Sequence, residues 1–168
     1  MTDLVVLDLI PATVFDVDEI NQLAIKIWSI HYPPIIGEEQ VNYMLNKMYA
    51  KEKLHHQISK KSQTYFLIQL KKQNIGFVSL EYTENKEAFI NKFYISNNQQ
   101  RNGLGQQTFL RIINYFKEVN TFRLQVNRQN FIAINFYFKM GFVIEKVEDF
   151  DIGDGYQMND FIMIWKRK

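Results

Sequence analysis

A glycine-containing segment at residues 100–105 is the first candidate for a functional site. It reads QRNGLG. It follows an apolar, strand-like run that ends at Ile95 and precedes a helical run that begins near Gly103. Glycine tolerates positive φ and lets the backbone approach a ligand, and the following helix presents unpaired N–H groups to an anion. The segment therefore predicts a turn that binds a pyrophosphate.

Two other phosphate-binding patterns do not fit this segment. A dinucleotide fingerprint reads G-x-G-x-x-G and a P-loop ends in Gly-Lys-Ser or Gly-Lys-Thr, whereas residues 103–108 read GLGQQT. Neither nucleotide-binding fold is expected, so the surrounding elements must identify the ligand.

The composition indicates one globular domain over residues 1–168. Apolar residues make up 46% of the chain and charged residues 23%, which is the balance of a soluble protein with a single core. No apolar run has the length of a membrane span, and the N-terminus does not resemble a secretion signal. Because the chain has no cysteine, we expect a cytoplasmic protein.

Metal ions, nucleic acid and membranes are not expected as partners. The three histidines, His31, His55 and His56, lack the i, i+4 spacing of a helical metal site. The formal net charge of +2 is too small to predict a nucleic-acid surface.

The spacing of apolar residues divides the chain into strands, where they alternate, and helices, where they recur every three or four positions. Asp16 and Glu19 have the spacing of a capping box at the start of the first helix. Strands are expected at 4–10, 64–70, 75–82, 88–95, 122–126, 142–150 and 157–165. Helices are expected from Asp16 to before Pro33, through Val41 to Met48, around Leu54 to Ile58, from near Gly103 to Phe116, and over Asn130 to Met140.

This order of elements predicts an α/β (α+β) fold with a mixed, mostly antiparallel central sheet. A polar turn at 71–74 joins two of the early strands as a hairpin. Between 88 and 126, the sequence of strand, turn, helix and strand predicts a parallel pair joined by a crossover.

The turn and the order of elements together resemble the GCN5-related N-acetyltransferase family. Its hallmark is Gln or Arg, two free positions, Gly, one free position, then Gly or Ala, which Gln100, Gly103 and Gly105 match. A second family segment lies on the next strand and helix. It reads here Asn130, Ala133, Phe136-Tyr137, Lys139 and Gly141-Phe142. The resemblance covers the whole chain and implies an acyl-coenzyme A N-acyltransferase fold.

The resemblance implies acetyl-coenzyme A as cosubstrate, without a metal. Its pyrophosphate is expected on the turn, and its pantetheine arm beside the preceding strand. The residues assigned to the coenzyme are Phe93, Tyr94, Ile95, Gln100, Arg101, Asn102, Gly103, Leu104, Gly105, Asn130, Ala133 and Lys139. The helical spacing of Asn130, Ala133 and Tyr137 predicts that they share one face.

The chemistry implied by the family is acyl transfer from a thioester to an amine. The family places a tyrosine at Tyr137 as the general acid that protonates the departing thiolate, although an ordinary core tyrosine is the alternative. A backbone N–H near Tyr94 or Ile95 is expected to stabilise the oxyanion.

The general base stays open. Many family members carry a Glu where this chain has Asn91, which cannot accept a proton. The amine then either arrives neutral or loses its proton through water to Glu81 or Glu87.

By family analogy, the acceptor binds between the first two helices and the last hairpin, with Trp28, Tyr32, Asp151 and Asp160 as candidate contacts. The aromatic residues could instead pack the helices against the sheet. We expect an N-acetyltransferase that acts on a primary amine of a small molecule, such as a polyamine. The alternatives are acetylation of a protein or peptide, a non-catalytic acyl-coenzyme A sensor, and a purely structural domain. A homodimer is left open.

Overall fold

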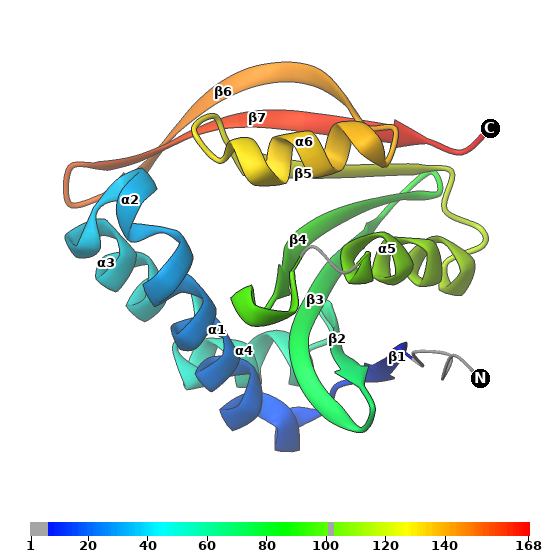
Figure 1. Ribbon diagram of the computed structural model, residues 1–168, viewed down its shortest axis with the longest axis horizontal. Helices are drawn as coiled ribbons and strands as arrows, with labels where there is room; N and C mark the ends of the chain where they lie inside the picture. Colours follow the sequence, from blue (N-terminus) through cyan, green and yellow to red (C-terminus); the bar gives the residue numbers. More distant parts are fainter. Residues whose placement is uncertain (1–6, 101–102) are drawn as a thin grey trace.

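A seven-stranded sheet in the order β1-β2-β3-β4-β5-β7-β6 organises the computed structural model, which describes residues 7–100 and 103–168 (Figure 1). The strands are β1 (Leu7–Pro11), β2 (Thr64–Leu70), β3 (Gln73–Thr83), β4 (Glu87–Ile95), β5 (Thr121–Asn127), β6 (Val143–Gly153) and β7 (Tyr156–Lys166). Neighbouring strands are antiparallel except for β4 and β5, which are parallel. The mixed sheet predicted from the sequence is confirmed.

The helices lie near their expected positions. They are α1 (Val17–His31), α2 (Pro33–Ile36), α3 (Glu38–Met48), α4 (Lys51–Ser59), α5 (Leu104–Tyr115) and α6 (Phe131–Lys139), with 3-10 turns at Val14–Asp16 and Asn97–Gln99. The predicted capping box of Asp16 and Glu19 is wrong. The Asp16 carboxylate accepts the Thr13 backbone N–H at 2.8 Å, and so caps the 3-10 turn before α1.

Alternation along the strands divides the core between the two faces of the sheet. In β2, Tyr65 and Leu67 pack with the buried residues of α1, α3 and α4. Phe66, between them, packs on the opposite face with Phe109 of α5 and Ile134 of α6. The four N-terminal helices therefore cover one face, and α5 and α6 cover the other (Figure 1).

The parallel pair of strands separates in the middle of the sheet. β4 and β5 pair only from Glu87–Thr121 to Ile90–Leu124, although both strands continue beyond these residues. On its other side, β3 pairs Leu80 with Ile90 and Ser79 with Lys92, so that Asn91 is an extra residue in β4. Such a bulge bends its strand. The bulge in β4 begins where the pairing of β4 with β5 ends, and β4 and β5 diverge from there.

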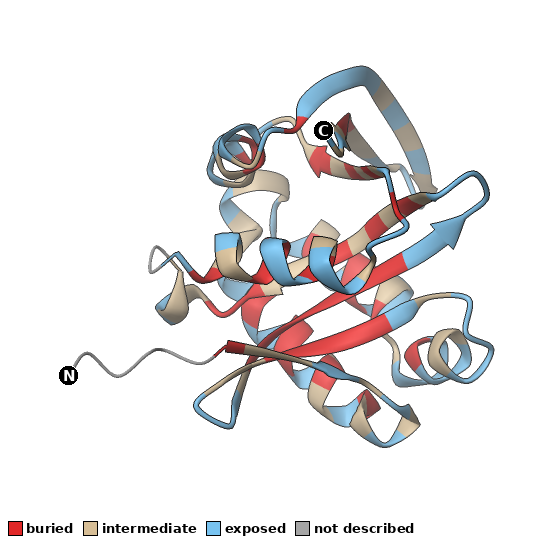
Figure 2. Ribbon diagram, turned by 90° about the vertical axis from the view of Figure 1, so that its right-hand side faces the viewer, coloured by how far each residue is buried: buried red, intermediate tan, exposed pale blue. Residues whose placement is uncertain are grey.

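Buried residues concentrate on the central strands, whereas the edge strand β6 is largely exposed (Figure 2). No helix within 7–100 and 103–168 is long and apolar enough to cross a membrane. Over the same residues, no group of three or more His, Asp and Glu side chains is arranged to hold a metal ion.

Candidate active site

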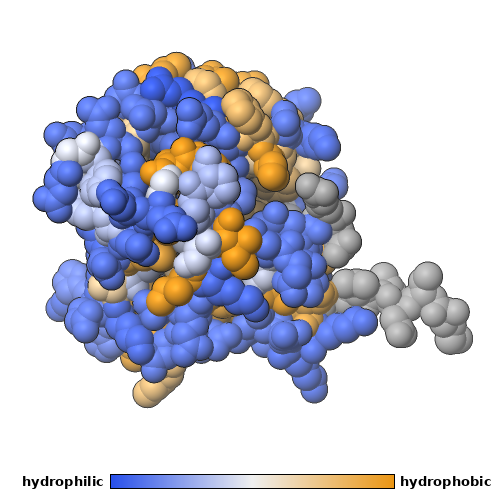
Figure 3. All heavy atoms as spheres, turned by 60° about the vertical axis from the view of Figure 1, so that its left-hand side comes forward, coloured by the Kyte–Doolittle hydropathy of each residue, from blue (hydrophilic) through white to orange (hydrophobic). Residues whose placement is uncertain are grey.

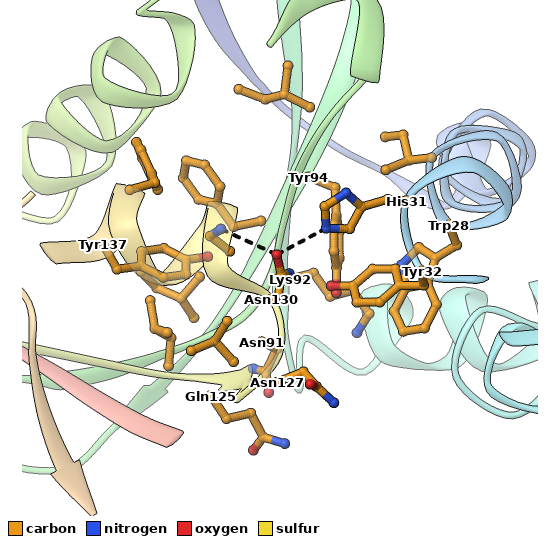
Figure 4. A pocket seen from close by; sticks show the side chains of 18 of the residues that line it. Trp28, His31, Tyr32, Asn91, Lys92, Tyr94, Gln125, Asn127, Asn130 and Tyr137 are labelled. Atoms are coloured by element: carbon orange, nitrogen blue, oxygen red, sulfur yellow. Dashed lines mark hydrogen bonds between the residues drawn. The ribbon is translucent and has the colours of Figure 1, made fainter. Parts of the chain in front are cut away.

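A cavity of about 770 Å³ occupies the space where β4 and β5 diverge. Residues of α1 and α3 line it on one side, and residues of α6 line it on the other. Figure 4 shows Tyr137 on one side of this space, with Trp28, His31 and Tyr32 opposite it.

Most of the residues predicted for the site lie in this cavity. Those that line it are Trp28, Tyr32, Phe93, Tyr94, Ile95, Gln100, Gly103, Gly105, Asn130, Ala133, Tyr137, Lys139 and Asp160. Leu104 does not: it is buried in the core beside Leu7 and Ile95. Arg101 and Asn102 lie outside the described residues.

The glycine turn joins the end of β4 to the start of α5. Gly103 precedes α5 with a φ of +71°, a conformation that glycine adopts without strain. The Gln100 side chain donates a hydrogen bond from Nε2 to the Ile95 carbonyl oxygen at 3.0 Å. A side chain at Gly105 would approach the Phe136 ring to 3.0 Å. The turn is therefore tied to β4 and packs closely against α6.

Asn130 caps α6 and contacts α1. Its Oδ1 accepts the Ala133 backbone N–H at 3.3 Å and lies 3.1 Å from His31 Nε2 (Figure 4). The contact with the helix N–H identifies this amide atom as the oxygen, so His31 Nε2 must be the donor in the second bond. His31, whose role sequence reasoning did not identify, thus connects α1 to α6 across the cavity.

Tyr137 lies on the cavity-facing side of α6, with 9% of its surface exposed. Burial raises the pKa of its phenol above the ordinary value, so the hydroxyl keeps its proton at neutral pH. Asn130, Ala133 and Tyr137, for which a common helix face is predicted, all line the cavity. A protonated hydroxyl at this place can donate a proton or a hydrogen bond.

Aromatic side chains form the opposite wall. Trp28 stacks on Tyr32 with ring centroids 4.2 Å apart, and its ring lies 5.3 Å from Tyr49 and 5.9 Å from Tyr94. Burial raises the pKa values of Tyr32, Tyr49 and Tyr94, so their hydroxyls remain protonated. Trp28 and Tyr32 therefore both pack the helices and line the cavity.

Asp160 is the one carboxylate among the described residues that line the cavity. It is 3% exposed and lies on β7 opposite Asn127 of β5. Burial raises its pKa to about 6, against the effect of the Gln125 amide, which donates to Oδ2 at 3.1 Å. Asp160 thus places a carboxylate in the wall of the cavity.

Lys92 is a buried cavity residue that sequence reasoning missed. Its side chain, on β4 next to the bulge, is 8% exposed and donates from Nζ to Gln63 Oε1 at 3.1 Å. Burial and the nearby Lys53 lower its pKa to about 7. Because β4 also carries Glu87 and Asn91, the local sequence offers no signal that this lysine is buried.

The acidic residues considered for the base lie elsewhere. Glu87 forms an ion pair with Arg123 at 2.6 Å, Glu81 is exposed, and neither lines the cavity. Asp151 does not line it either, because its carboxylate accepts the Gly153 backbone N–H at 2.8 Å within the hairpin turn. The hairpin thus contributes Asp160, and not Asp151, to the cavity.

Comparisons with known proteins identify similar chains. Residues 22–142 match the model of the acetyltransferase (GNAT) family. Spermidine N(1)-acetyltransferase of Thermoplasma acidophilum is 28% identical over 145 residues, which are 83% of this chain and 88% of that protein. The crystal structure of PaiA N-acetyltransferase from Thermoplasma acidophilum, in complex with coenzyme A, matches with a TM-score of 0.80 at 26% identity, covering 96% of this chain and 99% of that one. A spermidine N-acetyltransferase SpeG chimera from Vibrio cholerae and hSSAT shares the fold, with a TM-score of 0.71, 22% identity and 95% of each chain covered.

Proposed function

This chain belongs to the acetyltransferase (GNAT) family and is an acetyl-coenzyme A dependent N-acetyltransferase, and on that premise we propose that its acceptor is the primary amine of a small molecule. The amine binds in the cavity between Tyr137 and Asp160. The observation that carries this proposal is that hydrogen bonds cross the groove in which a peptide substrate would have to bind.

An extended peptide would require an open groove between the N-terminal helices and the β6–β7 hairpin. Two hydrogen bonds cross that space: Gln40 Nε2 donates to the Gln157 carbonyl oxygen at 2.8 Å, and the Tyr43 hydroxyl donates to the Ile152 carbonyl oxygen at 2.5 Å. In Figure 1 the end of the hairpin lies beside α2 and α3. These contacts favour a small acceptor over a peptide.

The coenzyme fits the other end of the same cavity. In this proposal the backbone at Gly103 and Gly105 receives the pyrophosphate at the start of α5. The pantetheine arm extends beside Phe93 to Ile95, and Lys139 offers a cation near the end of α6. This arrangement brings the thioester to the space between the diverging strands.

The residues at this space can perform acyl transfer. Asp160 binds the acceptor ammonium and takes its proton, for which a pKa of about 6 suits a base at neutral pH. The amine nitrogen then forms a bond to the acetyl carbon and releases its second excess proton to solvent, and the carbon–sulfur bond breaks. Tyr137 gives its proton to the leaving thiolate, and its phenol then recovers a proton from solvent.

Polyamines are the first acceptors to test. Two of the similar proteins are spermidine N-acetyltransferases by name, and Asp160 would attract a cationic amine. The measurement is thiol release from acetyl-coenzyme A with polyamines, amino acids, aminoglycosides and short peptides; since the chain has no cysteine, it adds no background. Turnover with a small amine supports the proposal. Turnover with peptides alone would point to protein acetylation, and coenzyme binding without any transfer would point to a sensor.

A further inference from the structure

One arm of the cavity is lined by hydrogen-bond donors. We call it the donor arm; it consists of Trp28, Lys53, Gln57, Gln63 and Lys92, all of which line the cavity beside Tyr49. Lys92 connects its members, since its Nζ donates to Gln63 and lies 5.6 Å from the centre of the Tyr49 ring. Figure 4 shows Lys92 extending toward the side of Trp28 and Tyr32, away from Tyr137.

The two glutamines of the donor arm have their oxygens engaged. Gln63 Oε1 accepts both Lys92 Nζ and the Ser79 hydroxyl, each at 3.1 Å. Gln57 Oε1 accepts the Tyr65 hydroxyl at 2.6 Å. Gln63 therefore has only its amide N–H groups to offer to a ligand, and Gln57 has its amide N–H groups and one remaining lone pair on Oε1.

The indole N–H of Trp28 is buried beside the Tyr49 side chain. The Trp28 side chain is 3% exposed, and Nε1 makes no hydrogen bond to the described residues. A buried donor left unpaired is costly, and such groups are usually satisfied by a partner. The Tyr49 hydroxyl is the neighbouring group that can supply this partner, because the two side chains interact.

The charged residues of the donor arm are lysines, so its charge and its hydrogen-bond donors both favour an anionic ligand. Lys92 has no carboxylate within salt-bridge distance among the described residues, and the neighbouring charge that acts on it is the cation Lys53. Burial raises the pKa of Tyr32, and Asp160, the single carboxylate among the described residues that line the cavity, raises it further, as Tyr137 does at the reacting end. The cavity is thus acidic at one place and basic at another.

We propose that the donor arm binds a carboxylate of the acceptor, so that the substrate is a primary amine whose far end carries a carboxylate. This inference rests on the proposed function, because it assigns the reacting amine to Asp160. A carboxylate matches one buried lysine and the amide N–H groups of Gln57 and Gln63, whereas burying the second charge of a phosphate would require another buried cation. A diamine would instead place an ammonium beside Lys92.

The decisive experiment compares acceptors of equal chain length that differ only at the far end. Thiol release is measured with 4-aminobutyrate, putrescine and butylamine, and then with 5-aminovalerate and cadaverine. We expect kcat/KM for each aminocarboxylate to exceed that for the matched diamine at least tenfold. A preference for the diamines would overturn the inference and leave the proposed small-amine acceptor intact.

A variant tests the role of Lys92 itself. In Lys92→Met, the ratio of kcat/KM for 4-aminobutyrate to that for butylamine is expected to fall at least tenfold, mainly through KM. The control Lys26→Met, at an exposed site on α1, should keep the parent ratio. An equal loss with all amines would mean that Lys92 only supports the fold, and the inference would fail.

Binding measured without turnover separates the two proposals. Calorimetric titration of the coenzyme A complex with 5-aminovalerate is expected to show binding by the parent and at least tenfold weaker binding by Lys92→Met. If the parent binds 5-aminovalerate but acetylates no amine, the proposed function fails while the carboxylate site stands. If 5-aminovalerate does not bind, the carboxylate site is disproved.

Discussion

His31 Nε2 donates a hydrogen bond to Asn130 Oδ1 at 3.1 Å, although the two residues are 99 positions apart. The bond ties the last residue of α1 to the residue that caps α6. The two elements border the cavity from opposite faces of the sheet, so one amide oxygen serves both the helix start and the connection across the site.

Replacing Asn130 should therefore cost stability. Asn130→Ala removes the cap of α6 and the acceptor for His31, and we expect the free energy of unfolding to fall by about 1–2 kcal/mol in urea denaturation. Asn130→Asp is the matched control, because its carboxylate can accept both bonds. Equal losses in the two variants would show that the oxygen is not what matters.

Tyr137→Phe tests the general acid. The hydroxyl is lost while the ring keeps its packing 5.5 Å from Phe142, so coenzyme affinity measured by calorimetry should stay within about twofold. We expect kcat to fall about 100-fold. Tyr115→Phe, at an exposed tyrosine of α5, should behave like the parent. A Tyr137→Phe enzyme with the parent kcat would refute the assignment.

Asp160 should make the protein relatively less stable as the pH rises from 4 to 7. Its native pKa of about 6 lies above the unfolded value of 3.8, so the native state binds more protons between these values, and this contribution to stability is lost as the pH rises. Asp160→Asn removes the effect. The difference in unfolding free energy between parent and variant should change by about 2 kcal/mol between pH 4 and pH 7. Urea denaturation at the two pH values measures it, and a constant difference would contradict the prediction.

Lys92 should have the opposite pH dependence at higher pH. Its native pKa of about 7 lies below the ordinary value of 10.5, so the unfolded state binds more protons and stability rises above pH 7. The titratable groups that contact it are Lys53, Tyr49 and Tyr65, and burial keeps both tyrosines protonated. From pH 7 to pH 9 we expect the parent to gain about 2 kcal/mol over Lys92→Met in urea denaturation. No relative gain would mean that Lys92 is not desolvated.

The parts of the site that depend on local spacing could be predicted from the sequence. The turn at Gly103 and Gly105 depends on neighbouring residues, and the common face of Asn130, Ala133 and Tyr137 follows from the helical repeat. The strands and their mixed directions could also be predicted, because alternation and turn residues are local signals.

Features that depend on distant partners could not be predicted. Asp151 and Asp160 lie on one hairpin, and only the insertion of β7 between β5 and β6 buries Asp160. Lys92 is buried against Gln63 and Tyr65 of another part of the chain, and its place in β4 is shifted by the bulge. The outer face over the N-terminal helices is mostly hydrophilic, with apolar side chains gathered near its centre (Figure 3). Nothing in the local sequence distinguishes the exposed lysines of the described residues from the buried Lys92.

Asn91 is one extra residue in β4, and the shift in strand pairing at this residue lies at the start of the cavity. The gap begins where the backbone of β4 stops pairing with that of β5. The residues that select the acceptor can therefore change without closing the gap, whereas deletion of Asn91 would remove the bulge and the bend that it gives to β4. A chain of this kind can diversify its substrates by substitution in the walls, but it is intolerant of a change in length at one position.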